Sequence, residues 1–151
     1  MSSKAQKSPI GYISIRVFAH ATEDQDRVIQ ALRNMMPEGL AKDAIFKKTN
    51  LTGHHGNPIT IIETELAERP KLPSALEKIG QCLTSLDKET LNGEMKMHLE
   101  KGNLYLRFDK QQAFLGAVRF SSNDPIHVKF HFRNKTPDEI VAICKEAGLL
   151  P

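Results

Sequence analysis

Two adjacent histidines stand between glycines in the stretch GHHGNPI, which begins at Gly53. Imidazole nitrogens bind metals and transfer protons near neutral pH, so His54 and His55 are the first candidates for chemistry. Successive side chains of a strand diverge, however, and a closed metal site needs two further ligands that the neighbouring sequence does not offer. We therefore predict no metal and no cofactor, and we keep a metal-dependent hydrolase that uses these histidines as an alternative.

Other catalytic patterns are missing from the sequence, which has no Gly-X-Ser-X-Gly, no cysteine beside a histidine and no phosphate loop of the GxxxxGK type. Glu63 and Glu65 lie two residues apart, and a solvated strand face explains them better than acid–base catalysis does. His127 and His131 share a strand face, but the charge of Lys129 between them would oppose a bound cation. We predict a protein that is not an enzyme.

Basic and aromatic residues occupy one side of three alternating segments, IGYISIRVFAH from Ile10, LYLRF from Leu104 and IHVKFHFR from Ile126. The series comprises Tyr12, Arg16, Phe18, Tyr105, Arg107, His127, Lys129, His131 and Arg133. If the segments are neighbouring strands, one sheet face would present rings among cations, which suits unstacked RNA bases and their phosphates. An ordinary solvated surface, with Tyr12 and Phe18 beneath a second helix, explains the pattern equally well.

The strand patterns extend beyond these segments. Strands are predicted over residues 10–20, 44–51, 58–66 and 126–133, with a hairpin from Met95 to Phe108 that is broken at residues 101–103. Between the second and third strands, Gly53 and Gly56 can take positive φ, and Pro58 forces Asn57 into an extended conformation. The GHHGNPI stretch therefore predicts a hairpin loop, either one that meets phosphate or a base edge or a turn in which a histidine caps a carbonyl.

Helical spacing accounts for much of the remaining chain. Helices are predicted from a Thr22–Gln25 capping box to about Met36, from Leu72 to Leu86, for one or two turns before Gly116, and from Thr136 to about Ala147. Asn92 and Gly93 are typical of a turn. These elements predict an α+β fold, a two-layer sandwich with helices on one face of a mostly antiparallel sheet.

Composition limits the number of domains and the class of protein. A chain of 151 residues with 40% hydrophobic content predicts one domain over residues 10–151, after a flexible tail of residues 1–9. The start lacks the apolar centre of a secretory signal, and Cys82 and Cys144 are interpreted as buried thiols of a reduced, cytoplasmic protein. Lysine and arginine exceed acids by three in residues 1–50 and again in 101–151, whereas acids exceed them by three between, so a basic face can form from the two ends.

Three stretches together resemble a known family: HATEDQDRVIQALRNMMP from His20, GHHGNPI from Gly53 and LYLRFDKQQAFLG from Leu104. They are similar to the archaeal RNA-binding domain family, long a domain of unknown function and also described as predicted exosome subunits. The likeness extends from about Ile10 to Phe132. It implies an α+β sandwich like that of ribosomal protein L5 and a role in RNA binding connected with RNA processing or the ribosome.

The resemblance supplies no catalytic residue, and it implies contacts in the glycine loop and around the end of the hairpin. We predict a non-catalytic RNA-binding protein whose partners are ribosomal RNA or an exosome substrate RNA, with exosome or ribosome components as further partners. The alternative is a protein-interaction subunit of an RNA-processing complex, bound through a sheet edge or the last helix. The predicted RNA contacts are His54, His55, Asn57, Tyr105, Arg107, Lys110, Gln111, Arg16, Lys129 and Arg133.

Overall fold

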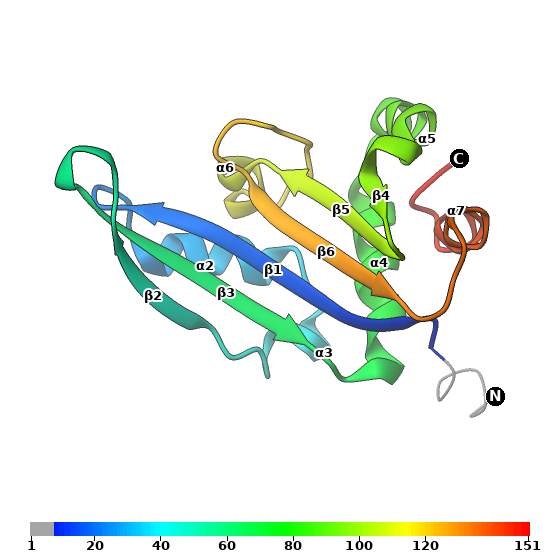
Figure 1. Cartoon of the computed structure of the whole chain (residues 1–151), viewed down its shortest axis with the longest axis horizontal. Coiled ribbons are helices and arrows are strands. Elements are labelled where there is room, and N and C mark those ends of the chain that lie inside the picture. The colour runs from blue at the N-terminus through cyan, green and yellow to red at the C-terminus, as the bar shows by residue number, and fades with distance from the viewer. Residues whose placement is uncertain (1–7) are drawn as a thin grey trace.

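A computed structural model describes residues 8–151, apart from the side chain of His54. Residues 1–7, which are most of the predicted tail, lie outside the described residues. The described chain forms two layers, a six-stranded antiparallel sheet and a set of helices packed on one of its faces (Figure 1). The predicted two-layer α+β sandwich is confirmed.

The sheet places the first strand of the chain near its centre. Its strands are β1 (Ile10–His20), β2 (Lys47–Thr52), β3 (Pro58–Leu66), β4 (Leu99–Glu100), β5 (Asn103–Phe108) and β6 (Ile126–Phe132), in the spatial order β2-β3-β1-β6-β5-β4. The three segments with alternating basic and aromatic residues, β1, β6 and β5, are therefore neighbours. Alternation sends Ile13, Ile15 and Val17 of β1 into the core, where each is at most 3% exposed, and leaves the intervening side chains on the opposite face.

The helices form the second layer. They are α2 (Gln25–Asn34), α3 (Glu38–Ala41), α4 (Leu72–Cys82), α5 (Ser85–His98), α6 (Lys110–Phe114) and α7 (Pro137–Glu146), with 3₁₀ turns η1 (His54–Gly56) and η2 (Arg69–Lys71). Figure 1 shows α2, α3 and α4 behind the sheet, with α5 and α7 beside its β4 end. No helix of residues 8–151 crosses the front face, so the alternative in which Tyr12 and Phe18 lie beneath a second helix does not hold for the described chain.

Helix starts follow their caps. The predicted cap of the last helix is present, because Thr136 Oγ1 accepts a hydrogen bond from Glu139 N and Glu139 Oε1 accepts one from Thr136 N. The predicted Thr22–Gln25 capping box is wrong. Asp24 caps α2 by accepting from Asp26 N at 2.9 Å.

The predicted helix from Leu72 to Leu86 is two helices. The leucine spacing continues across the break, but Thr84 accepts a hydrogen bond from Asp87 N and begins α5 there, leaving Leu86 71% exposed. Buried Leu91 and Met95, four residues apart, keep the chain helical through the predicted turn at Asn92-Gly93. The predicted turn is therefore wrong, and the first arm of the predicted hairpin shrinks to the two residues of β4.

The two cysteines are free thiols in different surroundings. Cys144 is buried, which raises the pKa of its thiol to about 12, whereas Cys82 is exposed and so departs from the predicted burial. Within residues 8–151, the helices fall short of the length and apolar character that a membrane crossing requires.

Candidate nucleic-acid interface

The uncovered face of the sheet carries rows of side chains set by the strand register. One row crosses five strands and consists of Arg107, His127, Arg16, Glu63 and Lys47, from β5 to β2. Directly opposed residues have Cβ atoms about 5 Å apart, so each of these side chains can influence the next. We call the part formed by β1, β6 and β5 the open face.

Two further rows complete the open face. Tyr105 on β5 lies opposite Lys129 on β6, and Lys129 lies opposite Ser14 on β1. In the next row His131 of β6 stands between Asn103 on β5 and Tyr12 on β1. The register therefore brings together four of the predicted contacts, Arg16, Tyr105, Arg107 and Lys129.

The rings on the open face differ in how much of them is accessible. Tyr12 stacks on His131 with 4.8 Å between ring centroids, and the Lys129 ammonium lies 5.2 Å from the centroid of the Tyr12 ring. Tyr105 is 40% exposed and is therefore the more available stacking surface. The Arg16 guanidinium lies 5.6 Å from the centroid of the Phe18 ring, and the Phe18 and His127 rings are nearly perpendicular, with 6.4 Å between their centroids.

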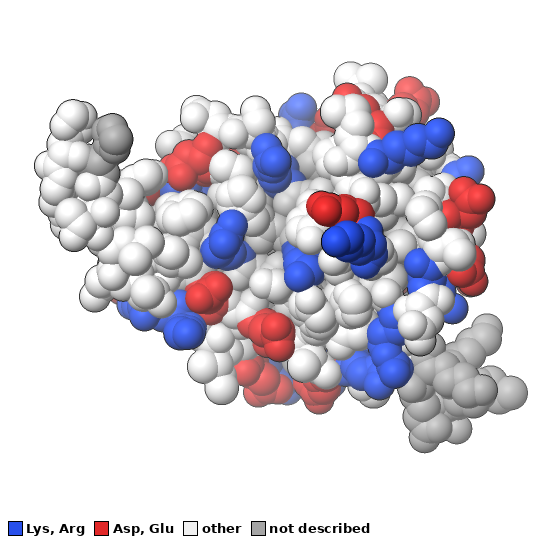
Figure 2. All heavy atoms as spheres, viewed as in Figure 1, with Lys and Arg blue, Asp and Glu red and all other residues white. Residues whose placement is uncertain are grey.

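Charge on the open face is predominantly basic, and the next strand is acidic. Arg16 and Arg107 form no ion pair with any described residue, whereas Glu63 and Glu65 of β3 face outward beside β1. Figure 2 shows basic and acidic side chains together on this side of the molecule. An anion would therefore be held over β1, β6 and β5, away from β3.

Neighbouring groups shift the pKa values of two titratable side chains on the open face. Partial burial and then the charges of Arg16 and Arg107 lower the pKa of His127, so its imidazole is neutral at pH 7. A hydrogen bond with the Tyr12 side chain raises the pKa of Lys129, which keeps its ammonium charged. The site thus offers fixed cations and one neutral imidazole that can bond a base edge.

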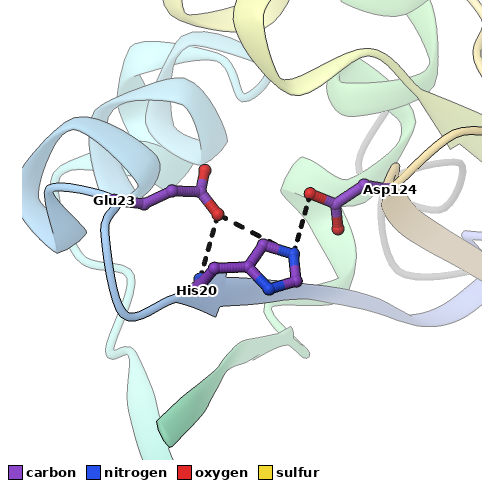
Figure 3. A group of neighbouring side chains, drawn as sticks. All are labelled: His20, Glu23 and Asp124. Carbon is purple, nitrogen blue, oxygen red and sulfur yellow. Dashed lines mark hydrogen bonds and ion pairs between the residues drawn. The ribbon is translucent and has the colours of Figure 1, made fainter. Parts of the chain in front are cut away.

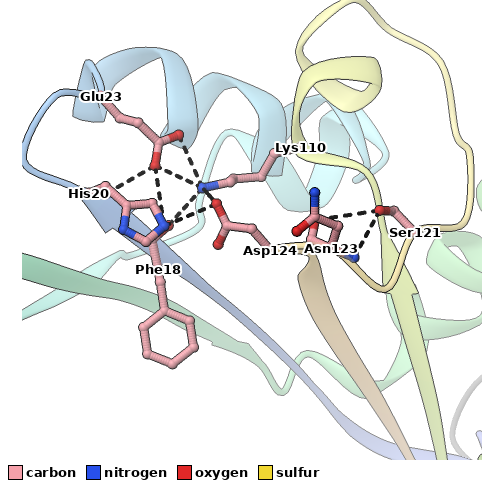
Figure 4. Close-up of polar contacts among 7 residues, drawn as sticks. All are labelled: Phe18, His20, Glu23, Lys110, Ser121, Asn123 and Asp124. Atoms are coloured by element: carbon pink, nitrogen blue, oxygen red, sulfur yellow. Dashed lines mark hydrogen bonds and ion pairs between the residues drawn. The ribbon is translucent and has the colours of Figure 1, made fainter. Parts of the chain in front are cut away.

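Lys110 is not on the open face. Its ammonium donates to Phe18 O at 2.8 Å and contacts carboxylate oxygens of Glu23 at 2.9 and 3.0 Å and of Asp124 at 2.8 Å (Figure 4). The side chain is 9% exposed, and these acceptors use all three of its N–H donors. Lys110 therefore ties β1, the start of α2 and the loop before β6 together and has no donor left for phosphate.

The same cluster is the one group of three potential metal ligands found among the described side chains. His20, Glu23 and Asp124 have ligand atoms within 4.8 Å of one another, and His20 Nε2 lies 3.1 Å from Asp124 Oδ2 (Figure 3). Lys110 already places its positive charge against both carboxylates, and a metal ion there would meet its repulsion. Nothing in the spacing of the sequence signalled this cluster, because Asp124 reaches it only through the tertiary fold.

The GHHGNPI stretch forms the β2–β3 connection at one tip of the molecule (Figure 1). Gly53 N donates to Asn57 O at 2.6 Å, and a Cβ added to Gly53 would overlap the Ile59 side chain. Gly56 takes φ 76°, as predicted, whereas the second positive φ of the turn, 60°, is at His55 and not at Gly53. Asn57 and His55 are exposed, while the predicted role of the His54 side chain lies outside the described residues.

The last two predicted contacts lie elsewhere. Gln111 is exposed on α6, which packs against α2 in the helical layer. Arg133 is exposed just beyond β6, with its aliphatic stem over Gly11. The predicted contacts are thus divided among the open face, the two ends of the sheet and the helical layer.

Comparison with known proteins decides the family. A family model described as RNA binding matches residues 12–132. The chain belongs to this RNA-binding family. The family resemblance of the three sequence stretches is confirmed, and the matched residues include all of the open face.

Relatives of the family carry the same likeness over most of their length. RNA-binding protein PAB1135 of Pyrococcus abyssi is 39% identical over 121 residues, 78% of each chain, and uncharacterized protein MJ0213 of Methanocaldococcus jannaschii is 33% identical over 83% of this chain and 86% of its own. The structure of Mth689, a DUF54 protein from Methanothermobacter thermautotrophicus, is 30% identical and superposes with a TM-score of 0.74 over 94% of this chain and 98% of its own. Protein AF2318 from Archaeglobus fulgidus shares the fold, with a TM-score of 0.75 at 23% identity over 91% of this chain and 99% of its own.

Proposed function

We propose that this protein binds a single-stranded segment of RNA on the open face and catalyses no reaction on it. One observation carries the proposal. Arg107, His127 and Arg16 lie opposite one another on three neighbouring strands, on the face that no described helix covers and beside the exposed ring of Tyr105. The family match and the name of the Pyrococcus relative support RNA as the ligand.

Each part of the open face has a chemical role in this proposal. Arg16 and Arg107 bind phosphate, because a guanidinium presents paired donors to a phosphate group and neither residue is used in an ion pair among residues 8–151. Tyr105 stacks on a base, and Phe18 beneath Arg16 provides a second apolar surface. Unstacked bases are needed for such contacts, which favours single-stranded RNA over a duplex.

The test is a binding measurement on Arg16→Gln/Arg107→Gln. Fluorescence polarisation with a labelled single-stranded RNA should give affinity about tenfold weaker than the unaltered protein, and a salt slope smaller by about 1.4 if each arginine neutralises one phosphate. The matched control is Lys42→Gln/Lys96→Gln, which removes two exposed charges outside the open face. Equal affinities and slopes for the two variants would refute the proposal.

We further propose that the bound RNA belongs to RNA processing beside the exosome or to the ribosome, as the resemblance implies. A cytoplasmic setting is proposed separately, because both cysteines are free thiols. Ribosomal RNA and exosome substrates are the RNAs to try first. Affinity purification from a native host, with and without nuclease, is the test. Exosome or ribosome components that are retained only without nuclease would support an RNA-mediated link, and the loss of both sets in every condition would contradict it.

A protein-interaction subunit is the second candidate, because β2 is an edge strand of the sheet. It pairs only with β3 among the described strands, and Leu51 on it and Ile45 just before it are 46% and 85% exposed. An open edge accepts an added strand from another chain. Partners that survive nuclease treatment and are lost after Leu51→Lys would favour this function.

A further inference from the structure

A hollow of about 510 Å³ lies at the end of the sheet, between the β4–β5 turn and the turn from β6 to α7. The side chains around it are mostly basic or polar: Lys101, His131, Arg133, Asn134 and Lys135. None of the described residues that line it is acidic. Figure 2 shows lysine and arginine side chains gathered at this end, where β6 ends in Figure 1.

The backbone fixes this arrangement. Lys101 and Gly102 take φ 51° and 80°, as a two-residue type I′ hairpin turn requires, and Asn134 takes φ 50° in the second turn. Phe132 N donates to Gly102 O at 2.8 Å, which ties the two turns together. Lys101 therefore stands on one rim of the hollow, while Arg133 and Lys135 are carried by the facing turn.

The cations around the hollow have no carboxylate partner within the described residues. Lys101, Arg133 and Lys135 form no ion pair there. In the chain, Glu100 precedes Lys101, and Asp138 and Glu139 follow Lys135. The Glu139 carboxylate accepts a hydrogen bond from Thr136 N at 2.9 Å, and the charge of Lys135 contributes to the lowered pKa of Glu139. Three cations that line one concave site without an ion pair are the chemistry that binds a phosphate group.

The hollow is continuous with the open face through His131. Its ring stacks on Tyr12 of the open face, and the same residue lines the hollow. Its Nδ1 lies 2.7 Å from Asn103 Oδ1, and because an amide oxygen only accepts, Nδ1 is the donor and the ring orientation is fixed. A strand of RNA that lies on the open face reaches the hollow without crossing the acidic strand β3.

We propose that this hollow binds a phosphate group of the RNA; this inference rests on the proposed function. The group is either a terminal phosphate monoester or a phosphodiester within the strand, and both present oxygens to Lys101, Arg133 and Lys135. No residue of the hollow other than Arg133 is among the contacts that the sequence predicted.

The first test compares two RNAs of one sequence, with a 5′-phosphate and with a 5′-hydroxyl, on Arg133→Gln/Lys135→Gln. Affinity should fall by at least about tenfold against the Lys42→Gln/Lys96→Gln control, because the loss of a single charged hydrogen bond already implies a change of that size. A loss confined to the 5′-phosphorylated RNA assigns the terminal group, and an equal loss for both assigns an internal phosphate. Affinity and salt slope equal to those of the control for both RNAs would overturn the inference while leaving the open face intact.

The second test does not depend on RNA. Inorganic phosphate titrated into the unaltered protein should shift the amide resonances of Gly102, Asn134 and Lys135, and the shifts should vanish in Arg133→Gln/Lys135→Gln. Circular dichroism and the thermal midpoint report whether that variant is folded, which is expected because both side chains are on turns. If phosphate shifts these resonances but the unaltered protein binds no RNA, the proposed function alone is refuted. If phosphate causes no shifts and Arg133→Gln/Lys135→Gln binds RNA as the control variant does, the phosphate site in the hollow alone is refuted.

Discussion

Arg107 and Lys110 lie three residues apart in the chain and have opposite surroundings. Arg107 projects from β5 onto the open face and has no ion pair within residues 8–151, whereas Lys110 begins α6 and has its ammonium enclosed by Phe18 O, Glu23 and Asp124. A sequence count treats the two cations alike. The difference shows that the acceptors around a cation, which the tertiary fold supplies, decide whether its charge is available to a ligand.

The largest expected effect comes from Lys110→Met. Removing the ammonium leaves Glu23 and Asp124 facing each other and Phe18 O without its donor, and the loss of one partner of a buried pair costs several kcal/mol. Because the two carboxylates are 31% and 37% exposed, solvent screening reduces the expected loss to about 2 kcal/mol in the free energy of unfolding. Urea denaturation measures it, with Lys96→Met as the control.

Asp124→Asn should have about half that effect, near 1 kcal/mol, because Lys110 keeps its contacts with Glu23 and Phe18 O. In a double-mutant cycle, the double variant Lys110→Met/Asp124→Asn should lose less stability than the sum of the two single losses. Strict additivity would show that the ammonium and this carboxylate do not stabilise each other.

Arg107→Gln should have the opposite effect to Lys110→Met, with RNA affinity reduced and stability nearly unchanged. Its free energy of unfolding should stay within about 0.5 kcal/mol of the unaltered protein, since the side chain is exposed and unpaired, while RNA affinity falls severalfold. Denaturation and fluorescence polarisation on the same preparation measure both. A stability loss as large as that of Lys110→Met would erase the contrast between the two cations.

The smallest effect concerns His127 and pH. Its pKa is lowered in the folded protein by burial and by Arg16 and Arg107, so the unfolded chain takes up a proton at a higher pH than the folded one. Stability from this group is therefore complete above the unfolded pKa and is lost as pH falls through it toward the lowered folded value. Unfolding midpoints at pH 7.5 and 5.5 should differ less for His127→Gln than for the unaltered protein. An identical pH dependence would remove His127 as a contributor.

Predictions from the sequence were most accurate for elements whose residue pattern is compatible with a single structure. Strict alternation in IHVKFHFR fixes which side of β6 is buried, because a one-residue slip would put Phe130 and Phe132 in water. The Thr136 cap likewise determined the start of α7. Where two local signals competed, prediction failed: the leucine spacing runs through Leu83 and Leu86, and only the Thr84 cap, together with the burial of Leu91, separates α4 from α5.

The candidate site was predictable in part for the same reason. Arg16, Tyr105, Arg107 and Lys129 share a face because alternation fixes their side of each strand, although their proximity depended on a strand order that the sequence left open. Lys110 and Asp124 are 14 positions apart in different elements, and no local period joins them. The basic hollow was missed because Lys101 and Lys135 line it from two separate turns, whose positive φ values are not visible in a pattern of polar and apolar residues.

The pairing of β1 with β6 has a consequence for the order of events during synthesis. Ile13 lies opposite Phe130, 117 residues later in the chain, so one edge of β1 stays unpaired until β6 has been synthesised. Contacts of such separation form late, and β1 meanwhile has only β3 as a partner. The open face is composed of β1, β6 and β5, and therefore a nascent chain cannot hold RNA in this manner until β6 has been synthesised.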